Sequence, residues 1–211
     1  HGVLFLDELP EFSRHVLEVL REPLESGHIL ISRAARQAEF PARFQLVAAM
    51  NPCPCGHAGD PLGQCRCTGE QIQRYHARVS GPLLDRIDIH IDVPRPRKTV
   101  IYPDSRGNEP SAQVAQRVDE ARKRQLGRQG CPNAQLDVDG IRRWCQLGEG
   151  ALALMEEAAE RMALSPRACH RVLKVARTIA DLEGREQIDD GDLGEAISYR
   201  RKPQSTATAI A

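Results

Sequence analysis

Two adjacent carboxylates, Asp7 and Glu8, follow directly on the apolar run Val3–Leu6. A continuous apolar run predicts a strand that is buried on both faces, as in the middle of a parallel sheet. In open α/β sheets, ligands bind outside the carboxyl ends of such strands. One carboxylate there can hold Mg²⁺ on nucleotide phosphates while the other orients an attacking water. A buried strand that ends in a solvated turn would explain the same residues without any chemistry.

Asn51 ends a second apolar segment, Leu46–Met50, which is also predicted to be a buried strand. Because the ends of parallel strands meet at one sheet edge, Asn51 is expected beside Asp7 and Glu8. An amide at that edge can hydrogen-bond a γ-phosphate or the attacking water. The alternative is a turn asparagine, which is common in front of a proline such as Pro52.

Arg86 directly precedes Ile87–Val93, a segment whose apolar residues alternate with polar ones. This period predicts a half-exposed strand. An arginine held at the edge of a domain can stabilise transition-state charge on the phosphates of a neighbouring subunit. A salt bridge to Asp85 or Asp88 is the structural alternative.

Arg167 is predicted to lie in the first turn of a helix, directly after the capping pair Ser165-Pro166. A cation is disfavoured at the positive end of a helix, and a bound phosphate would compensate for it there. A solvent-exposed arginine that carries a small energetic cost is the alternative.

Four of the seven cysteines crowd into one Gly- and Pro-rich loop: Cys53, Cys55, Cys65 and Cys67. Four thiolates suffice for a closed tetrahedral zinc site, and a loop too small to bury a core could be ordered by the metal. The C-x-C spacing is tighter than the usual C-x-x-C, and free thiols or redox chemistry remain the alternative. The odd count argues against a disulfide framework and fits a reducing cytoplasm.

A hairpin is predicted between Ile29–Ile31 and the segment that ends at Pro41. Its tip lacks the Asn-Gly type of turn, so the pattern is weak by itself. Arg33 and Arg36 at the tip could contact nucleic-acid phosphates. A solvated turn is the alternative.

The organisation predicted from the sequence is α/β followed by all-α. Residues 1–93 form the α/β part, residues 94–112 are a Pro-rich linker, residues 113–201 are helical and residues 202–211 are a polar tail. Ser13 is a predicted N-cap, and Thr68 with Gln71 has the spacing of a capping box. Helices are expected over residues 14–21, 69–79, 112–125, 138–146, 150–162, 166–183 and 190–199.

Composition narrows the function classes. The net charge is zero, so no global field steers the chain toward nucleic acid, and no apolar stretch approaches the roughly 20 residues that span a membrane. The 25 Arg against 4 Lys suit phosphate contacts. A phosphate-cradling G-x-x-x-x-G-K-[ST] loop is absent from the sequence, which begins with His rather than Met. We therefore expect the carboxyl-terminal part of a longer protein.

The order of these motifs resembles that of the magnesium-chelatase-like AAA+ ATPases, and among them the branch that acts in competence for DNA uptake and carries a four-cysteine insert. The resemblance implies a partial AAA+ P-loop NTPase core with a parallel sheet, without its Walker A half, and then a helical lid. It runs from residue 1 to about residue 201 and rests on residues 2–8, 48–56, 80–88, 165–167 and 177–182.

The resemblance also implies roles for single residues. Asp7 would be the Walker B residue that holds magnesium, and Glu8 would be the catalytic base. Asn51 would be sensor 1, Arg86 an arginine finger that acts on the next subunit, and Arg167 sensor 2 on the lid.

The function implied by the resemblance is an ATP-driven hexameric motor on DNA. Residues 27–42 would be the pre-sensor-1 hairpin in the ring's pore, where Arg33 and Arg36 would contact single-stranded or branched DNA. The complete protein would be a cytoplasmic branch-migration helicase of natural transformation and recombination, with ATP, Mg²⁺ and structural Zn²⁺, whereas the fragment alone would be inactive. The alternatives are a chelatase-type ATPase that remodels a protein partner, or a non-enzymatic zinc- and nucleic-acid-binding module.

Overall fold

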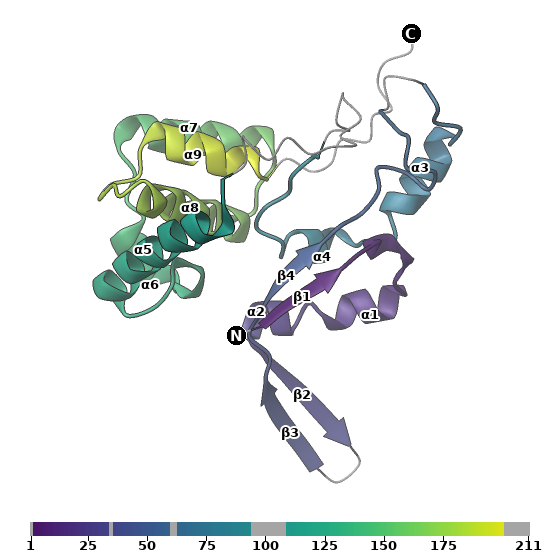
Figure 1. The fold of residues 1–211 in the computed structure, drawn as a ribbon, viewed down its shortest axis with the longest axis horizontal. Helices are drawn as coiled ribbons and strands as arrows, with labels where there is room; N and C mark the ends of the chain where they lie inside the picture. Colours follow the sequence, from purple (N-terminus) through teal and green to yellow (C-terminus); the bar gives the residue numbers. More distant parts are fainter. Residues whose placement is uncertain (1, 34–35, 60–62, 94–108, 201–211) are drawn as a thin grey trace. The chain divides into compact units, whose positions relative to one another are not determined.

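The computed structural model describes residues 2–33, 36–59, 63–93 and 109–200. The chain divides into two compact units, with the boundary between Ile87 and Asp88. The first unit combines strands and helices, and the second consists of helices (Figure 1). This is the α/β core followed by a helical domain that the sequence predicts.

The first unit is built around two parallel strands, β1 (Gly2–Leu6) and β4 (Phe44–Ala48). Gly2 lies opposite Phe44 and Leu6 lies opposite Ala48, so the two strands end at the same level. Residues that lie opposite each other in the two strands therefore point to the same face of the sheet.

One face of this sheet packs on the small core of the first unit. Leu6 and Ala48 pack against the buried side chains of Leu9, Leu17, Val79 and Leu83. The opposite face is open in this chain: Val3 is 68 % exposed and Phe5 is 60 % exposed. The expectation of a strand buried on both faces is therefore wrong here, because the described helices of the unit cover one face of a sheet of two strands.

Capping side chains fix where the short helices of the first unit begin. The Ser13 hydroxyl accepts a hydrogen bond from the Val16 backbone N–H, and Thr68 and Gln71 form the predicted capping box. The helix after Thr68 ends at His76, earlier than the predicted residue 79. The helical segments are η1 (Leu9–Glu11), α1 (Arg14–Val19), α2 (Pro23–Ser26), α3 (Gly69–His76) and α4 (Gly81–Leu84).

The predicted hairpin is present as β2 (His28–Arg33) and β3 (Arg36–Pro41), which pair antiparallel from His28–Pro41 to Arg33–Arg36. It extends away from the β1–β4 sheet, from the end where β4 begins (Figure 1). Arg33 and Arg36 close the ladder through their backbones. Their side chains and residues 34–35 lie outside the described residues.

The strand predicted over Ile87–Val93 does not form. Ile89, Ile91 and Val93 are 46 %, 68 % and 87 % exposed, and the His90 N–H donates to the Tyr199 carbonyl instead of to a ladder. Alternation describes a half-buried strand only when a neighbouring strand accepts its hydrogen bonds. Among the described residues this segment has no such neighbour.

The second unit packs its helices around α8, whose Val172, Ala176 and Ala180 are fully buried together with Leu193. None of the described helices is both long and apolar enough to cross a lipid bilayer. The helical segments are α5 (Ser111–Gln129), η3 (Asn133–Gln135), α6 (Val138–Trp144), α7 (Glu149–Arg161), α8 (Pro166–Leu182) and α9 (Asp190–Ser198).

Candidate nucleotide and metal sites

Hydrogen bonds between the two chain segments continue beyond the last strand pair. The Ala49 N–H donates to the Leu6 carbonyl at 2.9 Å, and the Leu9 N–H donates to the Ala49 carbonyl at 2.9 Å. The segment with Asp7 and Glu8 is thereby held alongside the end of β4. Because the two strands end level, Asp7 and Glu8 after β1 and Asn51 after β4 lie on segments that leave the sheet at the same end.

The acidic pair forms a strained turn. Glu8 has φ 52° and ψ 47°, in the left-handed region that a non-glycine residue rarely adopts. Its N–H donates to the Asp7 carboxylate at 2.9 Å, and both side chains are exposed. Strain of this kind costs about 1–3 kcal/mol and concentrates at functional sites. The exposed carboxylate oxygens are the hard ligands that Mg²⁺ takes in phosphate-transfer sites.

The segment that carries Asn51 is fixed from α3 by two residues that sequence reasoning missed. The Tyr75 side chain is 5 % exposed, and its burial raises the pKa of the phenol, although a hydrogen bond with the Asn51 backbone opposes the rise. The next residue of α3, His76, donates from Nε2 to the Pro52 carbonyl at 3.0 Å. In the sequence, Tyr75 and His76 are marked only by their place at the end of the capped helix, which does not indicate that they contact Asn51 and Pro52.

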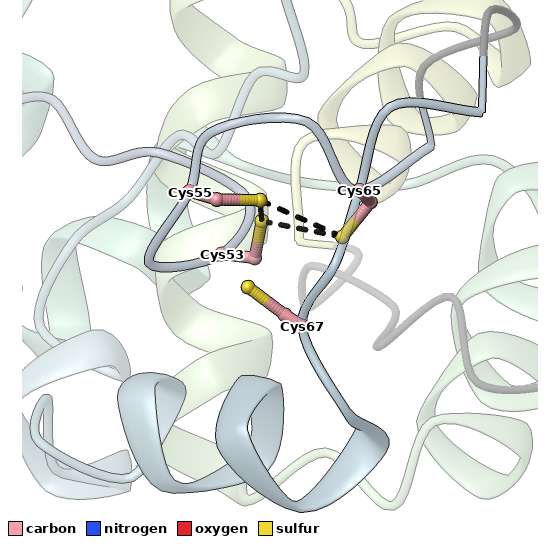
Figure 2. Close-up of side chains that lie close together, drawn as sticks. All are labelled: Cys53, Cys55, Cys65 and Cys67. Atoms are coloured by element: carbon pink, nitrogen blue, oxygen red, sulfur yellow. Dashed lines mark hydrogen bonds between the residues drawn. The ribbon is translucent and has the colours of Figure 1, made fainter.

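The sulfurs of the four clustered cysteines converge on one point (Figure 2). The Sγ atoms of Cys53 and Cys55 are 3.4 Å apart, and Cys65 Sγ lies 3.8 Å from the former and 3.7 Å from the latter. The Sγ atom of Cys67 completes the group, and all four Sγ atoms lie within 4.8 Å of one another. A tetrahedral zinc with Zn–S bonds of about 2.3 Å spaces its sulfurs about 3.8 Å apart. The described cysteines form no disulfide. Their sulfur separations match those of a metal tetrahedron.

The electrostatics of the cluster also fit a cation. Backbone hydrogen bonds from Arg66 and His57 lower the pKa of the Cys55 thiol to about 6, whereas a hydrogen bond with Cys55 raises the pKa of Cys67 to about 12. The thiol pKa of Cys65 is also raised, because burial and the neighbouring sulfurs outweigh a backbone hydrogen bond from Cys67. Without a cation the cluster cannot hold four thiolates, and a bound metal would supply the missing positive charge.

Arg86 is held within its own unit by Glu25. Its Nη2 donates to Glu25 Oε2 at 2.5 Å, and its Nη1 donates to the Pro82 carbonyl at 2.7 Å. The Arg86 side chain is 16 % exposed and that of Glu25 is 37 % exposed. Sequence reasoning missed Glu25, because 61 residues separate it from Arg86.

Arg167 lies in the first turn of α8, where Ser165 is the predicted N-cap and accepts a hydrogen bond from the Ala168 N–H at 3.2 Å. Its side chain is exposed. Arg167 belongs to the second unit, whereas the acidic pair belongs to the first.

Comparison with known proteins identifies the family. Residues 1–101 match the family described as magnesium chelatase, subunit ChlI, and residues 108–200 match the C-terminal part of the same subunit. The chain belongs to the magnesium chelatase family.

Proteins of several bacteria are similar to this chain along most of its length. The chain is 51 % identical over 201 residues to competence protein ComM of Haemophilus influenzae and 49 % identical over 200 residues to the uncharacterized protein YifB of Escherichia coli. It is 40 % identical over 204 residues to an uncharacterized protein of Mycobacterium tuberculosis. Each match covers 95 % of this chain but only 39–40 % of the relative, so the chain spans about two fifths of the length of these relatives.

Proposed function

We propose that the protein to which this chain belongs is an ATP-driven, ring-forming motor on DNA. The observation that carries the proposal is the end of the sheet where the strained turn of Asp7-Glu8 is hydrogen-bonded to the segment that follows β4 and leads to Asn51. Membership of an AAA+ family supports the use of ATP and Mg²⁺. The similarity to a competence protein favours DNA as the partner.

Each residue at this edge has a distinct part in hydrolysis. Asp7 would hold Mg²⁺, which neutralises phosphate charge when bound. Glu8, one residue further along the turn, would orient the attacking water and accept its proton. Asn51 would hydrogen-bond the terminal phosphate or the same water, as a sensor of the nucleotide state.

The two arginines would complete the site from outside this edge. Arg86 would act on ATP bound by the next subunit, and Arg167 on the helical lid would contact the phosphates of its own subunit's nucleotide. A guanidinium supplies a planar fork of donors that suits phosphate oxygens. Such sharing of a site between subunits requires an assembly of subunits, and we propose a ring of six in the cytoplasm.

The β2–β3 hairpin would be the DNA-contacting element. It extends from the end of the sheet opposite to the acidic pair, so a nucleotide and a DNA strand need not compete for space. Arg33 and Arg36 pair at the end of its ladder and would meet DNA phosphates in the pore. Repetition around a ring would concentrate positive charge there even though the chain has no net charge.

The four cysteines Cys53, Cys55, Cys65 and Cys67 would hold one structural Zn²⁺. Their sulfur separations and their number fit a closed tetrahedral site with no open position for catalysis. Bound zinc orders a loop that has no hydrophobic core of its own.

The test is ATP hydrolysis by the complete protein with and without single-stranded and branched DNA. Stimulation by DNA, followed by movement of a branched junction, is the expected result for a branch-migration helicase that acts in natural transformation and recombination. Hydrolysis that ignores DNA would instead favour a chelatase-type ATPase that remodels a protein partner. DNA binding without any hydrolysis would favour a non-enzymatic zinc- and nucleic-acid-binding module.

A further inference from the structure

In this structure Arg86 is bound within its own unit by Glu25, which does not fit an arginine that contacts the phosphates of another subunit. Two nitrogens of the guanidinium donate within the unit, to the Glu25 carboxylate and to the Pro82 carbonyl, and the side chain is mostly buried. A carboxylate in charge-assisted contact neutralises the charge that a phosphate would need. The same fork of donors cannot satisfy both partners fully.

Glu25 stands at the base of the hairpin. It belongs to α2, a single turn that ends at Ser26 and is capped by Gly27, which has φ 73° and leads directly into β2. Any rotation of this turn therefore moves the Glu25 carboxylate relative to Arg86.

Hydrogen bonds tie both strands of the hairpin to this turn. The His28 N–H donates to the Ser26 hydroxyl at 3.1 Å, and that hydroxyl donates to the Glu22 carbonyl at 3.0 Å. From the other strand, the Ala42 N–H donates to the Gly27 carbonyl at 2.7 Å. A displacement of the hairpin would therefore be transmitted to α2 through the bonds of Ser26 and through Gly27.

We propose that Glu25 is a positioning residue that withholds Arg86 from the neighbouring subunit until the β2–β3 hairpin moves. Engagement of DNA by the hairpin displaces α2, the carboxylate releases the guanidinium, and Arg86 becomes available to the phosphates of the next subunit's ATP. This inference rests on the proposed function and adds a route by which DNA controls hydrolysis.

The test compares Glu25→Gln with wild type in the complete protein. The amide keeps the shape of the side chain but loses the charge that holds Arg86. We expect DNA-free turnover to rise about tenfold, which corresponds to about 1.4 kcal/mol, with little change in KM for ATP. Stimulation by DNA should shrink by a similar factor, because the contact that DNA releases is already weakened.

Three further variants make the result specific. Glu70→Gln removes the carboxylate of an exposed ion pair with Arg74 in the same unit and should behave as wild type. Glu25→Asp retains the charge and should retain more of the DNA dependence than Glu25→Gln. In Glu25→Gln combined with Arg86→Ala the gain should vanish, because it depends on the released guanidinium.

A gain in turnover separates this role from a structural one, since a poorly folded variant loses activity with and without DNA. Unchanged or reduced DNA-free turnover in Glu25→Gln would overturn the inference, provided that wild type is stimulated by DNA and Arg86→Ala is inactive. Absence of DNA stimulation in wild type, or normal turnover of Arg86→Ala, would instead overturn the proposed function and the inference with it.

Discussion

Asp181 is the residue of the helical unit whose loss should be most destructive. Its side chain is 1 % exposed and accepts hydrogen bonds from Arg128 at 2.6 and 3.0 Å and from Asn133 at 2.8 Å. One of its oxygens also lies 3.1 Å from a guanidinium nitrogen of Arg177, itself 1 % exposed. Asp181→Ala would leave a buried guanidinium without its countercharge.

The expected loss of unfolding free energy follows from this burial. Removing one partner of a buried ion pair costs about 3–5 kcal/mol, a large part of the total stability of a domain. Asp181→Asn keeps the volume of the side chain, so a comparable loss in that variant would assign the cost to charge rather than to a cavity. Glu157→Ala is the matched control, because Glu157 forms an exposed pair with Arg161 at 3.0 Å, and such pairs contribute less than about 1 kcal/mol.

The assay is urea unfolding followed by tryptophan fluorescence. Trp144 is the single tryptophan of the chain and packs against the core of the helical unit, with the Arg143 guanidinium carbon 4.7 Å from its ring centre. The signal therefore reports this unit alone. If Asp181→Ala and Glu157→Ala differ by less than about 1 kcal/mol, the buried network is not the stabilising element that its geometry indicates.

Three other predictions concern pH, zinc and hydrolysis. Burial would raise the pKa of Asp181, but hydrogen bonds from Arg128 and Asn133 and the nearby guanidinium charges lower it below the ordinary value of 3.8. The ionised carboxylate therefore stabilises the fold above pH 3.8, and this contribution is lost as the pH falls toward the lowered pKa. The difference in acid unfolding between wild type and Asp181→Asn should show this loss. Replacing Cys65 and Cys67 with Ser should release about one zinc per chain in metal analysis, and a metal-free native protein would refute the site. Glu8→Gln should slow hydrolysis by about 10²- to 10⁴-fold while ATP still binds. Mixing its subunits with inactive Arg86→Ala subunits should restore turnover at interfaces that combine the two intact residues, and no recovery would argue against action between subunits.

Local signals in the sequence located most of the secondary structure. Ser13, Thr68 and Ser165 are N-caps in the structure as predicted, because a capping hydroxyl acts on backbone donors only two or three residues away. The two continuous apolar runs do pair as parallel strands, so the segments that follow them leave the sheet at the same end. These inferences depend on neighbours in the chain or on a general rule of sheets.

Features that depend on distant partners were not predictable. The alternation over Ile87–Val93 is real, but strand formation requires a partner that the sequence does not specify. The contact of Arg86 with Glu25 joins the turn after α4 to helix α2, and the exposed face of β1 depends on what covers the sheet. In each case the same residues fit two structures, and tertiary context decides between them.

Asn51 connects the candidate zinc loop with the proposed nucleotide site along the chain. Its backbone is held by Tyr75, and the next carbonyl, of Pro52, is held by His76. The following residue, Cys53, is fully buried and is one of the four converging thiols. The amide side chain that would sense phosphate is therefore two residues from a candidate zinc ligand, and the Pro52 carbonyl between them is held by His76. Loss of metal should disorder the loop first and then loosen Asn51, so removal of zinc should impair hydrolysis more than ATP binding.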